Sequence, residues 1–203
     1  MNKIVLIGAG GHARSCIDVI ESSGEFQIVG LIDNNKSNYN DSLGYPIIGV
    51  DHDLPKIRKK YDNAFITLGQ IKDSKKRMDL FRILNQLDFT LPRIISPRAY
   101  VSKNAIIGES TIIMHDVLVN SNVQIGRNCI INSKSLIEHD SIIGDNCHIS
   151  TGAIVNGNVI IGNRTFLGSG AVTKECIKIG NNCVIGSGAN IKFDIESDLI
   201  IKK

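Results

Sequence analysis

The feature that most constrains the fold of this chain is a period of six between Ser96 and Ile191. Residues 96–191 divide into consecutive blocks of six without an insertion. The sixth place of each block is Ile, Val or Leu, except at Thr173, and the fourth place is always small or β-branched. A second period, of eighteen residues, is superimposed on the first, because an Ile-Gly pair marks the start of every third block. The glycines of these pairs are Gly108, Gly126, Gly144, Gly162 and Gly180.

A period of six within a period of eighteen predicts a three-sided coil of short parallel strands. Each block forms one side and one corner, and three blocks raise the chain by one strand spacing, about 4.8 Å. Corners require backbone conformations that Gly and Asn tolerate. Hexapeptide repeats are typical of parallel β-helices, and the 3.6-residue period of an amphipathic helix is absent. The residues expected to stack as an inner apolar ridge are Ile107, Ile125, Ile143, Ile161 and Ile179.

The first part of the chain has a different pattern, in which strands and helices alternate. We expect strands at about 3–7, 27–32, 46–50 and 64–68, helices ending near 22, 60 and 87, and a polar loop at 34–45. This alternation favours a small parallel sheet with helices on its faces. The predicted organisation is therefore a small Rossmann-like α/β domain at 1–92, followed by an all-β coil at 93–203.

Composition and charge exclude several classes of partner. The chain is 42% apolar and 21% charged, which is typical of a soluble globular protein. Its net charge of +3 comes without a basic cluster interleaved with aromatics, so we expect no nucleic-acid partner. The first eleven residues hold only a short apolar run, and no segment is long enough for a membrane span, so a cytoplasmic location is expected.

The five cysteines fit a reducing compartment, and they predict no metal site. Cys129, Cys147 and Cys183 all occupy fourth places of one column, where a small buried side chain is expected. No CxxC or HxxxH spacing brings ligands to one point.

The first strand-to-helix turn has the pattern Gly8-x-Gly10-x-x-Ala13, a relaxed form of the dinucleotide fingerprint. Glycines let backbone amides approach a phosphate, and the start of a helix favours negative charge. Asp33 follows the second strand, where its carboxylate could accept a hydrogen bond from a ribose hydroxyl or a sugar group. Only half the usual strands precede the coil, which favours a nucleotide-sized or smaller ligand over a dinucleotide. The alternative is a plain tight turn.

Histidine supplies the candidate for acid–base chemistry. His52 is expected on the polar surface, and three further histidines occupy outward places of the coil: His115, His139 and His148. A neutral imidazole can take a proton near pH 7, and a carboxylate can orient it. His139 is followed by Asp140, which makes it a candidate base in a cleft between packed coils. The alternative is an inert surface histidine.

The order of the motifs GAGGHA, IDNN, TLG and INSKSLIEHDSIIGDNCHIS resembles the family of bacterial sugar acetyltransferases that includes PglD and NeuD. The resemblance covers nearly the whole chain. It implies a left-handed parallel β-helix, a homotrimer, and a small N-terminal domain that holds a nucleotide-sugar or a related sugar. It also implies that acetyl-CoA, as co-substrate, lies between neighbouring subunits.

The same resemblance implies roles for particular residues. His139 corresponds to the catalytic base, and Asp140 stands where the family has an acidic neighbour, usually Glu. The implied cofactor-binding residues are His148, Gly157, Ser169 and Ser187, and the implied sugar-binding residues are Gly10, Gly11, His12, Asp33, Asn34, Gly69 and Asn132. Members commonly finish with Gly-x-Pro-Ala-Lys, whereas this chain ends KFDIESDLIIKK, so the far end of the groove is expected to differ.

Three functions are compatible with the sequence. The first is direct transfer of acetyl to an amino group of a nucleotide-linked 4-amino-sugar in bacterial surface glycan biosynthesis, with His139 as base, the Gly157 amide at the oxyanion and no acetyl-enzyme. The second is O-acetylation of sialic acid or a relative, because KSNYNDSLGYPIIG and INSKSLIEH resemble that branch more closely. The third is a non-catalytic trimeric scaffold. The acceptor, the acyl group and a contribution from His115 stay open.

Overall fold

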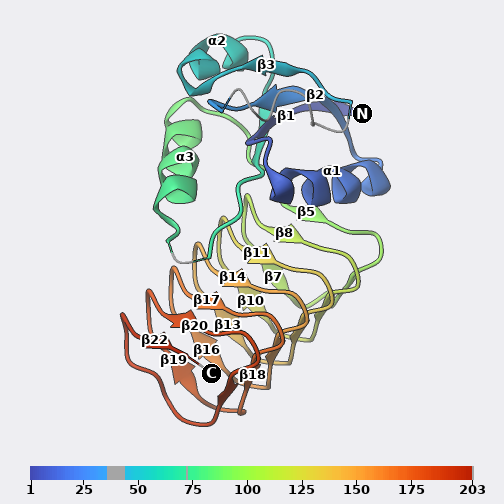
Figure 1. The fold of residues 1–203 in the computed structure, drawn as a ribbon. Helices are drawn as coiled ribbons and strands as arrows, with labels where there is room; N and C mark the ends of the chain where they lie inside the picture. The colour runs from blue at the N-terminus through green and yellow to red at the C-terminus, as the bar shows by residue number, and fades with distance from the viewer. Residues whose placement is uncertain (36–43, 72, 203) are drawn as a thin grey trace.

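The computed structural model describes residues 1–35, 44–71 and 73–202. An α/β part lies against the first rungs of a long triangular coil, and the two ends of the chain lie at opposite ends of the molecule (Figure 1). The first helix lies across the amino-terminal end of the coil, so the two parts share one apolar core. None of the helices in the described ranges is long and apolar enough to cross a membrane.

The α/β part contains a four-stranded parallel sheet with the order β3-β2-β1-β4. Its elements are β1 (Asn2–Ile7), α1 (Gly11–Ser23), β2 (Phe26–Ile32), β3 (Ile47–Gly49), a 3-10 turn (Asp51–Asp53), α2 (Leu54–Arg58), β4 (Asn63–Ile66) and α3 (Lys75–Gln86). The predicted alternation is confirmed, although the third strand and second helix are shorter than expected. Most of the loop predicted at 34–45 lies outside the described residues.

The coil has three flat sides, each built from strands of two residues. The side that begins with β5 contains β5 (Ile94–Ile95), β8 (Ile112–Ile113), β11 (Ile130–Ile131), β14 (His148–Ile149), β17 (Phe166–Leu167), β20 (Val184–Ile185) and β22 (Ile200–Ile201). The side that begins with β6 contains β6 (Tyr100–Val101), β9 (Leu118–Val119), β12 (Leu136–Ile137), β15 (Ile154–Val155), β18 (Val172–Thr173) and β21 (Asn190–Ile191). The side that begins with β7 contains β7 (Ile106–Ile107), β10 (Gln124–Ile125), β13 (Ile142–Ile143), β16 (Ile160–Ile161) and β19 (Lys178–Ile179). We call them the β5, β6 and β7 sides, and we name each corner by the two sides that it joins.

The predicted inner ridge is present. Ile107, Ile125, Ile143, Ile161 and Ile179 pair in register along the β7 side, and all are buried. Fourth-place side chains also point inward, where their polar atoms donate to corner carbonyls: Cys147 Sγ to Gly162 O at 3.0 Å, and Thr165 Oγ1 to Gly180 O at 2.8 Å. The column cysteines are therefore core residues, as predicted.

Two corner positions explain the glycine and asparagine pattern. A side chain at Gly126 would place its Cβ 2.7 Å from the carbonyl carbon of Gly144, so this glycine is required by the close approach of successive rungs. From Ser110 to Gly188 the third place of each block has positive φ, for example 56° at Asn128 and 59° at Asn146. Asn and Gly tolerate this left-handed conformation best.

The unusual tail completes the coil. Val184 pairs with Ile200 and Ile179 bridges Ile195, both across sixteen residues instead of eighteen, so the last turn is two residues shorter than the others. Phe193 lies in this shortened corner, with 77% of its surface exposed. The departure from the family pattern at the C-terminus is therefore a short closing rung.

Candidate active site

His139 lies on the β6/β7 corner, between β12 and β13, and its side chain is 60% exposed. Its Nδ1 lies 2.8 Å from Oδ2 of Asp140, and Oδ1 of the same carboxylate accepts a hydrogen bond from Asn122 Nδ2 at 2.8 Å. The hydrogen bond to Asp140, with the nearby charges of Asp140 and Glu138, raises the pKa of His139. This arrangement favours the tautomer with its proton on Nδ1, which leaves Nε2 to accept a proton.

The His139 ring borders a groove along the same corner. A cavity of about 450 Å³ is lined by Glu138, His139, Asn156, Gly157, Asn158, Glu175 and Cys176. A Cβ on Gly157 would lie 3.0 Å from both Cε1 and Nε2 of His139. The glycine one rung above His139 therefore leaves space for a reacting group beside the nitrogen that can accept a proton.

At some second places of the coil the backbone amide has no hydrogen-bond partner within the described residues, and Gly157, which borders this groove, is one of them. At many second places a side chain of the coil accepts from the amide: Asp145 Oδ1 accepts from Arg127 N at 2.7 Å, and Asn181 Oδ1 accepts from Asn163 N at 2.8 Å. Within the described parts of the chain, the amides of Gly157, Ser169 and Ser187 donate no hydrogen bond. These amides can donate to a ligand.

The residues predicted to bind the cofactor do not lie together in one chain. Gly157 shares the β6/β7 corner with His139, whereas Ser169 and Ser187 lie on the β5/β6 corner, at the other edge of the β6 side. Asn132 lies on that second corner too. The two corners lie at opposite edges of one flat side.

His148 is placed differently from the other outward histidines. It points out from the β5 side but is only 6% exposed, because residues that follow β4 cover it. Its Nδ1 lies 2.6 Å from Gln70 O, its Nε2 lies 3.2 Å from Asn132 Nδ2, and its ring packs edge-on against Phe166. Burial lowers the pKa of His148 to about 4. Within one chain, His148 therefore belongs to the junction of the two parts and not to the His139 groove.

The other two histidines that the sequence singled out have structural surroundings. His115 Nδ1 lies 2.7 Å from Ser96 Oγ and its Nε2 lies 2.8 Å from Asp18 Oδ2, so it ties the coil to α1. His52 is a surface residue, with 83% of its side chain exposed. His139 is the coil histidine that combines an exposed ring with a free Nε2 and a groove.

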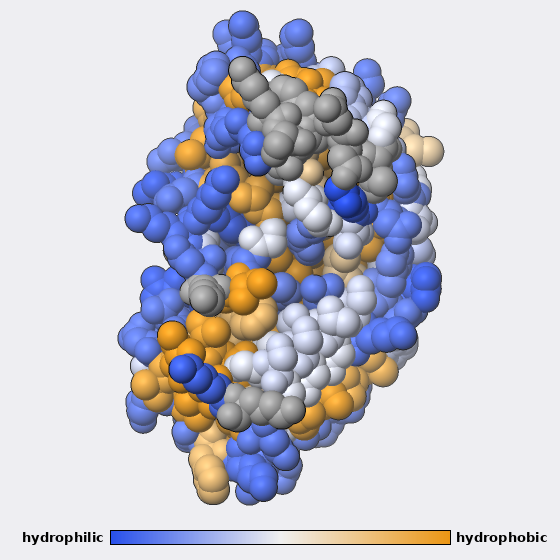
Figure 2. All heavy atoms as spheres, viewed as in Figure 1, coloured by the Kyte–Doolittle hydropathy of each residue, from blue (hydrophilic) through white to orange (hydrophobic). Residues whose placement is uncertain are grey.

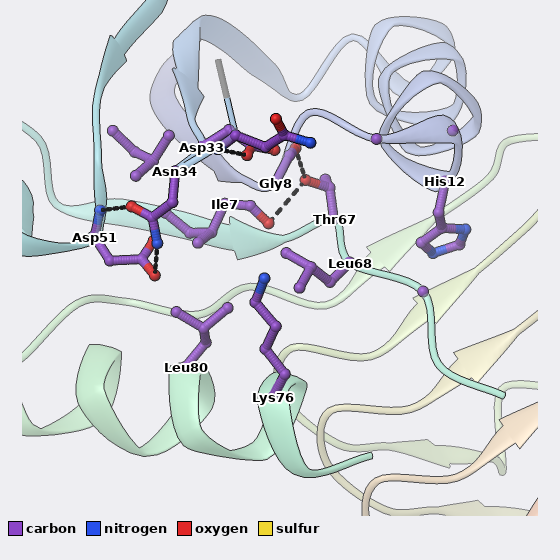
Figure 3. Close-up of a pocket in the computed structure, with 15 residues that line it drawn as sticks. Ile7, Gly8, His12, Asp33, Asn34, Asp51, Thr67, Leu68, Lys76 and Leu80 are labelled. Atoms are coloured by element: carbon purple, nitrogen blue, oxygen red, sulfur yellow. Dashed lines mark hydrogen bonds between the residues drawn. The ribbon is translucent and has the colours of Figure 1, made fainter. Parts of the chain in front are cut away.

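A second cavity lies in the α/β part, at the carboxyl ends of its strands (Figure 3). It has a volume of about 250 Å³. Its lining includes all six N-terminal residues that the sequence predicted for sugar binding: Gly10, Gly11, His12, Asp33, Asn34 and Gly69.

Hydrogen bonds show what the polar residues of this cavity do. Asp33 Oδ2 accepts from Ala9 N at 2.7 Å and its Oδ1 accepts from Asn35 N at 2.7 Å, so its carboxylate shapes the glycine turn. The Asn34 side chain donates to Asp51 Oδ2 at 2.6 Å and accepts from Asp51 N at 3.0 Å. Asp33 therefore has a structural role in the turn, and its role as an acceptor for a sugar stays a prediction.

The sequence reasoning missed Lys76, Thr67 and Asp51, which also line the cavity. Lys76 extends from the first turn of α3 toward the glycine turn (Figure 3), and it forms no hydrogen bond or ion pair within the described residues. Thr67 directly follows β4, the strand end where ligands of such sheets bind. The position of Thr67 after a strand could have predicted its place in the site. Nothing in the sequence distinguishes Lys76 from the other lysines of a surface helix.

His12 lies where the cavity meets the junction. Its Nε2 is buried without a hydrogen-bond partner among the described residues. Burial, with the nearby Arg77 and His148, lowers the pKa of His12 to about 3, so the ring is neutral. Arg77 is itself buried and donates to backbone carbonyls of Ile66 and Leu68 at 2.7 and 2.8 Å.

No group of three or more His, Cys, Asp or Glu side chains that could hold a metal ion occurs in the described ranges.

Comparison with known proteins agrees with this geometry. Residues 3–82 match the PglD N-terminal domain, and residues 104–139, 140–175 and 158–192 match the bacterial transferase hexapeptide family. The structure superposes on PerB from Caulobacter crescentus, solved with CoA and GDP-perosamine, with a TM-score of 0.93 and 29% identity over 100% of this chain and 95% of that one. It also superposes on the acetyltransferase domain of PglB from Neisseria gonorrhoeae, solved with acetyl coenzyme A, with a TM-score of 0.93 and 27% identity over 100% of this chain and 97% of that one.

Among curated sequences, UDP-N-acetylbacillosamine N-acetyltransferase of Bacillus subtilis is 27% identical over 115 residues, which cover 56% of this chain and 52% of that protein. The chain spans about half or less of the length of the curated relatives that it matches.

The fold and the two cavities define a hexapeptide-repeat protein, a left-handed parallel β-helix that carries a small α/β domain. Within that class, the α/β part matches the PglD N-terminal domain, and the whole chain is similar to the solved structures of PerB and of the acetyltransferase domain of PglB.

Proposed function

We propose that this protein transfers the acetyl group of acetyl-CoA to an amino group of a nucleotide-linked 4-amino-sugar in bacterial surface glycan biosynthesis, in the cytoplasm. The observation that carries the proposal is the His139–Asp140 pair, whose free Nε2 faces the space that Gly157 leaves. The structural relatives solved with CoA, acetyl coenzyme A and GDP-perosamine support it. The proposed site uses His139 and Asp140 as catalytic residues, with the sugar held by the N-terminal cavity.

The proposed reaction is a direct transfer. The sugar nitrogen attacks the thioester carbon while His139 Nε2 takes the proton from that nitrogen. The Gly157 amide, which has no partner within the described chain, donates to the oxygen that becomes negative. The carbon–sulfur bond then breaks, and the thiolate of CoA takes the proton from the imidazolium. Asp140 keeps the ring oriented and stabilises its positive charge.

The groove fits the co-substrate on the chain's own geometry. Gly157 leaves room for the thioester beside His139, because a Cβ there would touch the ring. The free amides of Ser169 and Ser187 can donate to carbonyl oxygens of an extended pantetheine arm. We assign acetyl-CoA to these residues.

The division of the site between two corners supports a homotrimer. In a closed ring, each contact joins two different surfaces of neighbouring copies. If the β6/β7 corner of one chain lies beside the β5/β6 corner of the next, His139 and Gly157 of one copy line one groove with Ser169 and Ser187 of the other. Five of the six outward residues of the β6 side are apolar or aromatic, from Tyr100 to Val172, and the sixth is Asn190; Tyr100 and Leu118 are exposed. Exposed apolar patches mark such contacts.

Apolar surface gathers over the lower part of the coil in the face that Figure 2 shows, beside a paler band near neutral hydropathy.

We expect the purified protein to form trimers in light scattering. The Leu136→Asp, Ile154→Asp double variant, which places two charges on the β6 side, should be monomeric and inactive. Lys178→Glu, a surface change on the β7 side, should stay trimeric. A fully active wild-type monomer would contradict the shared site.

The N-terminal cavity fits the nucleotide part of the acceptor. The amides at the start of α1 and Lys76, which has no partner within the described residues, both favour a diphosphate, and no acidic residue lies in the first turn of that helix.

Release of CoA thiol from acetyl-CoA tests the proposal, with UDP-4-amino-sugars, GDP-perosamine and sialic acid as separate acceptors. We expect release with at least one nucleotide-linked amino-sugar and an N-acetyl product by mass spectrometry. Release with sialic acid alone would instead support the O-acetyltransferase. No release with any sugar, together with sugar binding, would support the scaffold. Part of the segment that resembles the sialic-acid branch, 36–43, lies outside the described residues.

A further inference from the structure

We infer that Asn122 is a positioning residue for His139. Its side-chain amide holds the Asp140 carboxylate in the one orientation that keeps the imidazole proton on Nδ1. This inference rests on the proposed role of His139 as the base and adds a third member to the pair.

The contacts form a continuous chain across one rung of the coil. Asn122 Nδ2 donates to Asp140 Oδ1 at 2.8 Å, and Asp140 Oδ2 lies 2.8 Å from His139 Nδ1. Each oxygen of the carboxylate therefore has its own partner. Asn122 and Asp140 both have φ of 61°, so two short side chains extend from backbone that the corner fixes. The carboxylate cannot rotate toward solvent without breaking the bond to Asn122.

A side-chain hydrogen bond between corner residues of successive rungs also occurs elsewhere in this coil. Asn182 Nδ2 donates to Asp198 Oδ1 at 2.7 Å on the β7/β5 corner, and Asn128 donates to Asn146 at 2.8 Å. Asn146 has no second side-chain oxygen, and the second oxygen of Asp198 has no imidazole partner within the described residues. The Asn122 bond thus differs from its relatives only in what the carboxylate does next, which makes Asn182 a matched control.

Several charged or titratable groups face His139. Glu138 Oε2 accepts from Asn120 Nδ2 at 2.8 Å and from the His139 amide at 3.3 Å, and Glu175 and Cys176 line the groove. Asp140 alone among them is within hydrogen-bond distance of the ring. If Asp140 turned toward water, the tautomer with its proton on Nε2 would gain population, and that tautomer cannot accept a proton from the sugar.

The test compares Asn122→Gly with Asn182→Gly and Asp140→Asn. Glycine tolerates the positive φ at both Asn positions, so each Gly variant removes one amide without backbone strain. Nitrogen NMR of ring-labelled histidine gives the His139 pKa and tautomer, with its signal assigned by loss in His139→Asn. Turnover is measured with saturating acetyl-CoA and sugar.

In Asn122→Gly we expect a His139 pKa closer to its ordinary value, more Nε2–H tautomer, and turnover about tenfold lower with unchanged KM for acetyl-CoA. Asn182→Gly should match the wild type in the His139 pKa, the tautomer, turnover and the KM for acetyl-CoA. A His139 pKa and tautomer unchanged in Asn122→Gly, but changed in Asp140→Asn, would overturn the role of Asn122. Because NMR needs no turnover, a changed pKa in a protein without transferase activity would support the positioning role while refuting the proposed function.

Discussion

At the scale of single residues, the candidate chemistry depends on one exposed imidazole and its immediate neighbours. His139 is held by a hydrogen bond to Asp140 and not by burial, so its basicity comes from a local contact. The carboxylate has a partner of its own in Asn122, which lowers the pKa of Asp140 together with His139 itself. The Asp140 carboxylate therefore stays ionised and oriented at the surface of the coil.

The raised pKa of His139 predicts the acid side of the pH profile. A general base works only when unprotonated, so kcat/KM should fall on acidification at a higher pH than for an ordinary imidazole. Asp140→Asn removes the hydrogen bond and charge that raise the pKa. We expect that variant to lose activity about tenfold or more, with its acid limb moved to lower pH. An acid limb that stays in place would show that Asp140 does not set this pKa.

Lys76 is predicted to bind the acceptor and not to take part in the chemistry. In Lys76→Ala, isothermal titration should show weaker binding of UDP or GDP, by about tenfold, because one charge-assisted hydrogen bond is lost. Lys75→Ala is the matched control, since Lys75 is the adjacent lysine and lines only the neighbouring cavity. Equal affinities for wild type and Lys76→Ala would remove Lys76 from the site.

At the scale of elements, the corners of the coil decide which residues are allowed. First-place glycines are required by contact with the next rung, and third-place residues by positive φ. These are different requirements, because the first-place glycines have no room for a Cβ, whereas the third places also hold Lys134 and Arg164. Inner Ile side chains and fourth-place Cys and Thr fill the remaining core.

Two substitutions separate these requirements. Gly126→Ala should lower the free energy of unfolding by about 1–3 kcal/mol, because the new Cβ overlaps backbone of the next rung. Gly152→Asn should change it by less than about 1 kcal/mol, because Gly152 has φ of 65° and open space around its Cβ, and Asn tolerates that conformation. Urea unfolding gives both values. Similar losses for the two variants would contradict the distinction.

The repeat made the coil predictable because every column has one environment. Ile143 or Cys147 could be placed inward from spacing alone, and His139 outward for the same reason. Spacing could not show that His148, equally outward, is covered by residues after β4, because that contact joins residues 78 positions apart. Lys76 was missed for a related reason: its direction depends on how α3 packs.

At the scale of the whole molecule, buried basic groups join the two parts. Arg77 reaches from α3 to the carbonyls of Asn128 and Ser110 in the coil at 3.3 and 3.4 Å. Burial lowers the pKa of Arg77 to about 10, so it stays charged at neutral pH. His12 and His148 lie nearby and are neutral. The junction therefore tolerates one buried cation, and further protonation there is unfavourable.

This junction predicts a loss of stability in acid. The pKa of His148 is about 4 in the folded chain, below its ordinary value of 6.5, so the unfolded chain binds the proton more readily. Its contribution is intact above pH 6.5 and is lost as the pH falls toward 4, by about 2–3 kcal/mol at pH 4.5. Urea unfolding should show a smaller drop from pH 7.5 to 4.5 in His148→Gln than in wild type. His52→Gln, a surface control, should follow wild type; equal drops in all three proteins would contradict the assignment.

The most direct test of the account is single-turnover acetyl transfer by His139→Asn. The substitution keeps an exposed polar side chain at a corner position, so the variant should fold, form trimers and bind both substrates like the wild type. With acetyl-CoA and the preferred nucleotide-linked amino-sugar, we predict transfer slower by about 10²–10⁴-fold, the usual contribution of a general base. Transfer at the wild-type rate would show that the proton leaves the sugar by another route and would contradict the proposed site.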